Sequence, residues 1–80
     1  MDLNKVSGPI TGIDITGKIV VLKKSSLKPA FHGDRRFLAE GGFGAKPYLM
    51  GRAVFGKFLI DGEDGRIDRS DIEGLAEVQA

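Results

Sequence analysis

Short apolar runs separated by glycine-containing turns predict a chain of β-strands. The central four residues of one run, Ile19-Val20-Val21-Leu22, include three β-branched residues, which favour extended structure. This run is apolar without a break, which indicates that both faces of its strand are at least partly covered. The predicted strands span 10–15, 18–24, 35–40, 52–60 and 66–69.

The two-residue period of a strand assigns side chains to faces. Phe37 and Ala39 fall on one face of the third strand, and Val54, Gly56 and Phe58 fall on one face of the fourth. A glycine inside an apolar strand indicates a β-bulge or a close approach of another backbone. We therefore expect Gly56 to lie against a neighbouring strand.

The C-terminal segment, residues 70–78, carries two conflicting patterns. Ser70-Asp71-Ile72-Glu73 has the capping-box pattern of a helix start, and Ile72, Leu75 and Ala76 share a helical face. Gly74, however, costs a helix about 1 kcal/mol relative to alanine. One helical turn and a final strand are both open at this point.

These elements predict a mainly β fold. Five short strands give a small SH3-like barrel, with an OB-like barrel or a strongly bent antiparallel sheet as the alternative, and at most one short C-terminal helical turn. Closure would hide the strand edges that a flat sheet exposes. Eighty residues suit a single domain over 1–80, with 1–8 and 77–80 as its least ordered parts.

Composition narrows the class of protein. Apolar residues make up 41% and charged residues 29% of the chain, which fits a globular domain and argues against a disordered one. The absence of cysteine excludes disulfides and thiolate metal sites, and no cofactor is expected. No apolar stretch is long enough to span a membrane and none resembles a signal peptide, so we expect a cytoplasmic protein. The sequence leaves the oligomeric state open.

The net charge of +1 conceals an uneven distribution. Residues 1–57 carry ten basic and four acidic side chains, whereas residues 58–80 carry two basic and seven acidic ones. Charge runs are usually solvated or locally paired. The acidic segment therefore either neutralises the basic strands or leaves them free for a partner.

The irregular segment 41–51, with four glycines and Pro47, is a candidate binding loop. A phosphate-binding loop would lead directly into a helix, but here Pro47 and a predicted strand follow. Long irregular loops on small scaffolds often carry function. We therefore predict a non-catalytic module that binds a protein partner, with this contact set: Phe43, Lys46, Tyr48 and Arg52.

An alternative is a nucleic-acid-binding barrel that uses the basic and aromatic middle third of the chain. Bases stack on exposed aromatic rings while cations follow the phosphates. The residues of this alternative are Arg35, Arg36, Lys46, Tyr48, Arg52 and Lys57.

A second alternative is a degenerate calcium-binding turn at 61–71. Residues 64–71 match the second half of an EF-hand type loop, with Gly65 at the sharp turn. Ile60 and Gly62 would then stand at positions that require ligand oxygens, so no metal ligand is assigned.

Catalysis is not expected. His32 lies near Ser25, Ser26 and Asp34, but no spacing there requires a nucleophile, an oriented base and an oxyanion site. The chain is therefore predicted not to be an enzyme, with no catalytic residues.

Three segments carry a resemblance to a known group: Glu40-Gly41-Gly42-Phe43-Gly44, Gly51-Arg52-Ala53-Val54-Phe55-Gly56 and Asp61-Gly62-Glu63. Over residues 7–75 the chain resembles short domains of bacterial mobile elements, mostly from Gram-positive hosts. The resemblance includes no catalytic motif and transfers no functional residue. It implies an accessory protein of a plasmid, transposon or phage.

Overall fold

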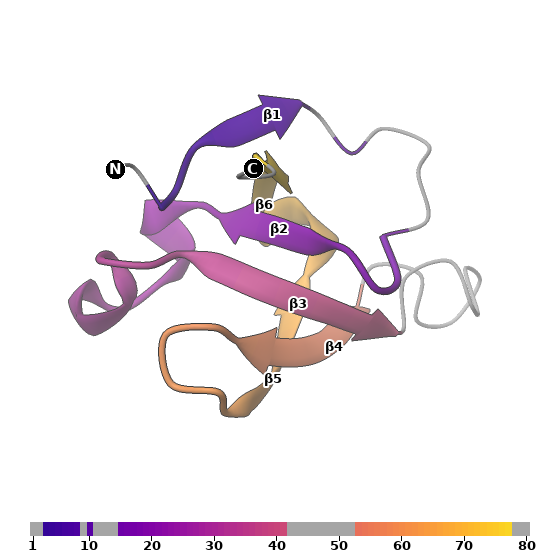
Figure 1. Cartoon of the computed structure of the whole chain (residues 1–80). Helices are drawn as coiled ribbons and strands as arrows, with labels where there is room; N and C mark the ends of the chain where they lie inside the picture. The colour runs from indigo at the N-terminus through magenta and orange to yellow at the C-terminus, as the bar shows by residue number, and fades with distance from the viewer. Residues whose placement is uncertain (1–2, 9, 11–14, 42–52, 78–80) are drawn as a thin grey trace.

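Six antiparallel strands form one sheet in the order β1-β6-β2-β3-β4-β5 (Figure 1). The structure is a computed structural model and describes residues 3–8, 10, 15–41 and 53–77. The strands are β1 (Val6–Gly8), β2 (Ile19–Leu22), β3 (Arg36–Gly41), β4 (Ala53–Phe58), β5 (Asp64–Asp68) and β6 (Ile72–Ala76). The predicted mainly β class is confirmed, as a bent sheet of six strands; the expected count of five and the closed barrel are wrong.

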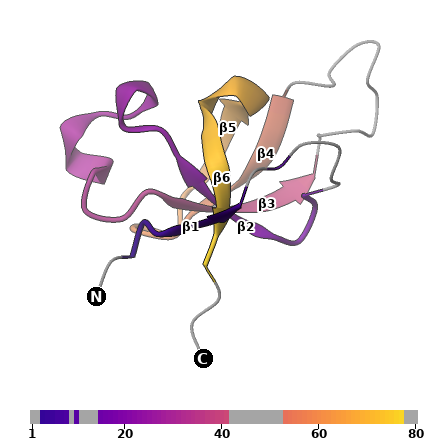
Figure 2. The same ribbon diagram turned by 90° about the horizontal axis from the view of Figure 1, so that it is seen from above.

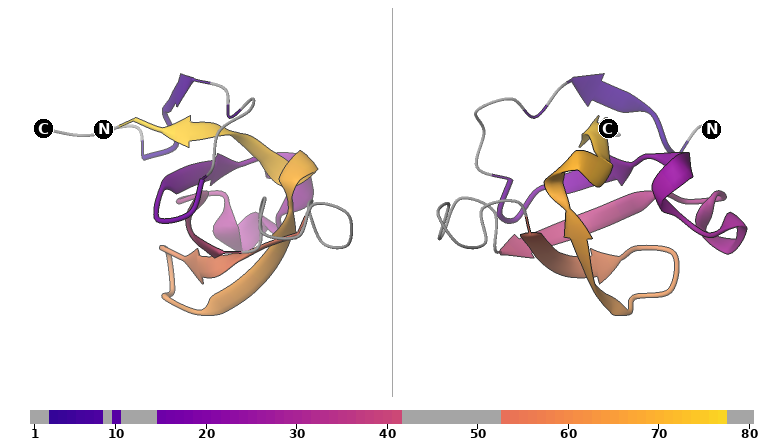
Figure 3. Two further views of the ribbon diagram at one scale, coloured as in Figure 1. Left: turned by 90° about the vertical axis from the view of Figure 1, so that its right-hand side faces the viewer. Right: turned by 180° about the vertical axis from the view of Figure 1, so that it is seen from behind.

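The helical segments of the described residues are three short 3-10 turns. They are η1 (Lys24–Ser26), η2 (Pro29–Phe31) and η3 (Arg69–Asp71). Within these residues no helix is long and apolar enough to cross a membrane. Strands β2 to β5 follow one another as neighbours, and the chain then returns through η3 so that β6 pairs with β2 (Figures 2 and 3).

The core lies on the concave face of the bent sheet. Phe37 and Ala39 of β3 are fully buried, as the alternation predicts, and so are Val20 and Val54 on the strands beside β3. Phe58 packs edge-on against Phe37 with ring centroids 5.0 Å apart, and its other neighbour is Phe31 of η2 at 5.1 Å. Edge-to-face rings add to the burial of apolar area. Phe58 thereby joins the sheet to the turn segment 24–33.

Gly56 lies where the backbone of β3 approaches β4 closely. It pairs with Ala39 of β3, and a Cβ atom added at Gly56 would overlap the carbonyl oxygen of Leu38 and meet the ring of Phe37 at 2.8 Å. The prediction of a close backbone approach is confirmed.

The C-terminal segment combines both of its sequence patterns. A capping box lies at the start of η3, with Asp68 as the N-cap and Asp71 as its reciprocal partner. It begins two positions earlier than the Ser70–Glu73 pattern predicts. The chain then extends into β6. A Cβ atom at Gly74 would meet Val6 and lie 2.5 Å from the carbonyl oxygen of Gly8. Glycine at this position therefore allows β1 to lie against β6.

Candidate functional site

The convex face of the sheet presents apolar and basic side chains to solvent. We call this the outer face, formed by Ile19, Arg36, Leu38, Phe55, Lys57 and Arg66. Strand register places Ile19 beside Leu38 and Leu38 beside Lys57, on the side opposite the core. Phe55 is 42% exposed and Ile19 is 39% exposed, although both are large apolar residues. The outer face therefore offers contact area that the fold itself does not use.

Arg36, one residue of the nucleic-acid alternative, is held by a carboxylate of its own chain. Its Nε donates to Oδ1 of Asp34 and its Nη2 to Oδ2, both at 2.8 Å. These hydrogen bonds lower the pKa of Asp34 below its ordinary value of 3.8 and raise the pKa of Arg36. The pair is a fixed, bidentate feature beside the sheet.

Lys57 and Arg66 are also engaged within the chain. The Nζ atom of Lys57 donates to Oδ1 of Asp64 at 2.7 Å, and this hydrogen bond raises the pKa of Lys57. The guanidinium of Arg66 lies over the ring of Phe55, 6.0 Å from its centroid. The cation and the ring therefore cover part of each other.

The side chain of Arg35 connects neighbouring parts of the fold and is mostly buried. Its Nη1 donates to the carbonyl oxygen of Leu22 at 2.8 Å and lies 3.4 Å from Oε2 of Glu73, and its side chain is only 12% exposed. Near the N-terminus, Lys5 lies 3.4 Å from Glu77. Three carboxylates of the acidic segment, on Asp64, Glu73 and Glu77, thus pair with cations from the basic part of the chain. In the described residues the acidic segment therefore neutralises part of the basic charge.

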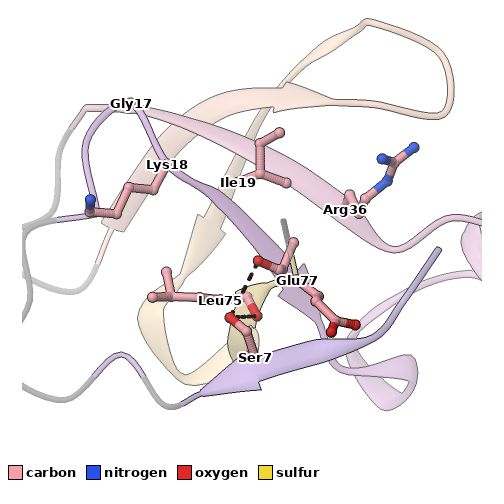
Figure 4. Close-up of a pocket in the computed structure, with 8 residues that line it drawn as sticks. Ser7, Gly17, Lys18, Ile19, Arg36, Leu75 and Glu77 are labelled. Carbon is pink, nitrogen blue, oxygen red and sulfur yellow. Dashed lines mark hydrogen bonds between the residues drawn. The ribbon is translucent and has the colours of Figure 1, made fainter. Parts of the chain in front are cut away.

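A groove of about 540 Å³ opens on the outer face at the seam between β1–β6 and β2–β3 (Figure 4). Val6 of β1 pairs with Ala76 and Gly8 pairs with Leu75, so β1 forms one wall along the end of β6. The single O–H of Ser7 supports this wall, shared between the carbonyl oxygens of Leu75, at 3.2 Å, and Ala76, at 3.4 Å. The lining residues are Ser7, Gly17, Lys18, Ile19, Arg36, Leu75, Ala76 and Glu77.

The groove has an apolar centre between charged groups. Ile19 lies between Lys18 and Arg36 on the upper wall (Figure 4). Arg36 is bound by Asp34 and Glu77 by Lys5, whereas Lys18 is exposed and forms no ion pair within the described part of the chain. Within the described part of the chain, the lining therefore carries one positive charge without an ion-pair partner, beside an exposed isoleucine.

His32 helps to fix the turn segment between β2 and β3. Its Nε2 lies 3.1 Å from the carbonyl oxygen of Lys24 and 3.2 Å from that of Leu27. Because carbonyls only accept hydrogen bonds, Nε2 carries the proton in this arrangement. Ser26, the nearest hydroxyl candidate, donates to Oδ1 of Asp71 at 2.8 Å. Both side chains thus hold backbone segments together.

The segment 61–71 begins in an acidic turn and continues as β5 and η3. Gly62 has φ +71°, and the amide of Glu63 donates to Oδ1 of Asp61 at 2.9 Å. Across the residues that the structure describes, no three His, Cys, Asp or Glu side chains come together as a metal site. The geometry gives the calcium alternative no support.

The predicted contact set, Phe43, Lys46, Tyr48 and Arg52, lies outside the described residues. Of the nucleic-acid alternative, Arg35, Arg36 and Lys57 are described, and each is paired within the chain. Sequence reasoning missed the groove, because the pairing of β1 with β6 joins residues about 70 positions apart and leaves no local signal.

Comparison with known protein families, with curated proteins and with solved structures finds no match for this chain.

Proposed function

We propose that the chain is a non-catalytic binding module whose partner is a protein. The observation that carries the proposal is the pairing of three cations of the basic part of the chain with the acidic segment, through Lys57–Asp64, Arg35–Glu73 and Lys5–Glu77. A nucleic-acid surface needs cations free to meet phosphates. A mosaic of paired charges around exposed apolar side chains is the pattern of a protein-binding surface.

The exposed side chains of the outer face support the same proposal. Ile19, Leu38 and Phe55 lie on three adjacent strands, and two of them are more than a third exposed. Aromatic residues are enriched at protein interfaces and charged residues are depleted at interface centres. We also propose an SH3-like arrangement of strands in an open, bent sheet, because the four-stranded meander β2–β5 ends in a 3-10 turn and β6 returns to β2.

A peptide-display selection on the intact chain tests the proposal. We expect enrichment of a consensus sequence, and binding of the synthetic consensus peptide by titration calorimetry, without binding of its scrambled version. Failure to enrich any sequence over several rounds, with the chain folded throughout, would overturn the protein-binding function.

Nucleic-acid binding is the second candidate, supported by Phe55. The ring is 42% exposed and lies beside Arg66 and Lys57, a combination on which a base could stack. Fluorescence anisotropy with labelled single- and double-stranded oligonucleotides at low salt separates the candidates. Saturable binding that is lost on Phe55→Ala would favour nucleic acid over protein.

A further inference from the structure

The groove at the β1–β6 seam is a hollow in the described surface that a partner could fill. Its volume of about 540 Å³ is within the range of known ligand sites, roughly 300 to 1,000 Å³. The wall is held in place by the β1–β6 pairing and by the O–H of Ser7, shared between the carbonyl oxygens of Leu75 and Ala76. The groove is therefore built by the fold, and a ligand would not have to order it first.

Charge decides which partner fits. Two of the three charged lining residues have their charge matched, Arg36 by Asp34 and Glu77 by Lys5. Lys18 is the exception among the described lining residues, and its neighbour Ile19 offers an apolar surface that is 39% exposed. A ligand that matches the groove combines an apolar side chain with a carboxylate next to it.

Arg36 adds a second donor to this arrangement. Asp34 occupies its Nε and one position on Nη2, whereas a guanidinium has five N–H donors. Since its side chain is 31% exposed, the remaining N–H groups can meet a ligand oxygen at the opposite end from Lys18 (Figure 4). Arg36 and Lys18 thus flank Ile19 with donors on both sides.

We propose that this groove binds an extended segment of a partner protein in which an apolar side chain has an acidic residue beside it. The apolar side chain rests on Ile19, and the carboxylate meets the ammonium of Lys18. This inference rests on the proposed protein-binding function and specifies its site and its ligand chemistry.

Charge reversal at Lys18 tests the inference. The selection is run on the intact wild-type chain, on Lys18→Glu and on Lys23→Glu, a matched reversal at an exposed lysine outside the groove lining. We expect the wild type and Lys23→Glu to enrich acidic-apolar sequences, and Lys18→Glu to enrich basic-apolar ones. The acidic consensus peptide should lose affinity for Lys18→Glu by about tenfold or more.

Ile19→Thr separates the apolar part of the site from the charged part. Threonine keeps the β-branch that a strand favours and removes apolar surface at an exposed position, so the fold should persist. In the selection, this variant should still enrich peptides with acidic residues but should no longer favour an apolar residue beside them. Amide spectra of all variants check that each is folded.

The outcomes distinguish the two proposals. If Lys18→Glu enriches the same sequences as the wild type, the groove inference is overturned and the protein-binding function stands. If the wild type enriches nothing, the protein-binding function fails with it. A dimer of the wild-type chain that Lys18→Glu dissociates in analytical ultracentrifugation would assign the groove to a second copy and would also overturn the inference.

Discussion

At the scale of single residues, two positions constrain the sheet: one has no room for a side chain, and the other holds a neighbouring side chain in place. Gly56 faces the carbonyl oxygen of Leu38 and the ring of Phe37, so there is no room for a Cβ atom. Asp34 holds the guanidinium of Arg36 by two hydrogen bonds at 2.8 Å. Gly56 allows the close spacing of β3 and β4, and Asp34 sets the direction of Arg36, which lines the groove.

Gly56→Ala should destabilise the domain by about 1–3 kcal/mol, because the added methyl forces β3 and β4 apart. Urea denaturation measures the free energy of unfolding. Gly41→Ala is the matched control, since Gly41 also lies in a strand paired with β4 but has open space where its Cβ would be. Equal losses for the two variants would contradict the close approach at Gly56.

Asp34→Asn should lower the free energy of unfolding at pH 7 by about 1–2 kcal/mol, because it replaces a charge-assisted pair. The pKa of Asp34 is lowered in the folded state, so the ionised carboxylate stabilises the fold above its ordinary pKa of 3.8. That contribution is lost as the pH falls through the folded-state pKa. Urea titrations of both chains from pH 7 to pH 2 should therefore converge at the acid end.

A constant difference between the two chains across this pH range would show that the charge of Asp34 contributes nothing. Glu63→Gln, in the exposed turn after β4, is the control and should change stability little at any pH.

At the scale of elements, η3 turns the chain from β5 so that β6 can pair with β2. The side chain of Asp71 accepts the amide of Asp68 at 3.1 Å and the hydroxyl of Ser26 at 2.8 Å, which ties the turn to η1. Asp68 in return accepts the amide of Ser70 at 2.9 Å. The end of β5 is thereby connected to the start of β6 at a defined angle.

Asp71→Ala should cost about 1 kcal/mol of stability, because it removes the hydrogen bonds that Asp71 accepts from Asp68 and Ser26. Asp71→Asn keeps an accepting oxygen, so this variant should retain most of the wild-type stability. Hydrogen exchange at the β6 amides that pair with β2 should speed up in the alanine variant alone. Faster exchange in both variants, or in neither, would contradict a capping role.

The elements also show how far sequence patterns reach. Strands β2, β3 and β4 were predictable, because β-branched runs and two-residue alternation are local signals that the buried residues Val20, Phe37 and Val54 bear out. β1 was not, since Val6-Ser7-Gly8 is three residues long and owes its structure to pairing with β6. The groove depends on that long-range pairing, so local sequence patterns could not predict it either. The charge distribution left open whether the acidic segment pairs with the basic strands, and the sheet register was needed to show which cation meets which carboxylate.

At the scale of the whole molecule, charge distribution separates the two candidate partners. Lys57, Arg35 and Arg36 each meet a carboxylate of the chain, so a nucleic acid would have to displace these contacts before it gained its own. We therefore expect oligonucleotides to bind at most weakly in low salt.

Anisotropy measured over a range of salt concentrations checks this expectation. A binding constant that falls with salt by a log–log slope of several units, at about 0.9 per neutralised phosphate in duplex DNA, would contradict it. The same titration with Lys57→Gln controls for the outer face, since a phosphate-binding role for Lys57 would reduce the slope by about one unit.

The most direct test of a protein-binding groove is amide and methyl shift mapping on the labelled wild-type chain, titrated with its selected acidic-apolar peptide. We predict saturable shifts at the amides of Ser7, Lys18 and Glu77 and at the methyl groups of Ile19 and Ala76, all of which line the groove. Shifts confined to residues 43–52 would move the binding site to the contact set predicted from the sequence. Shifts centred on Phe55 and Arg66, with the groove unchanged, would contradict the groove as the site of recognition.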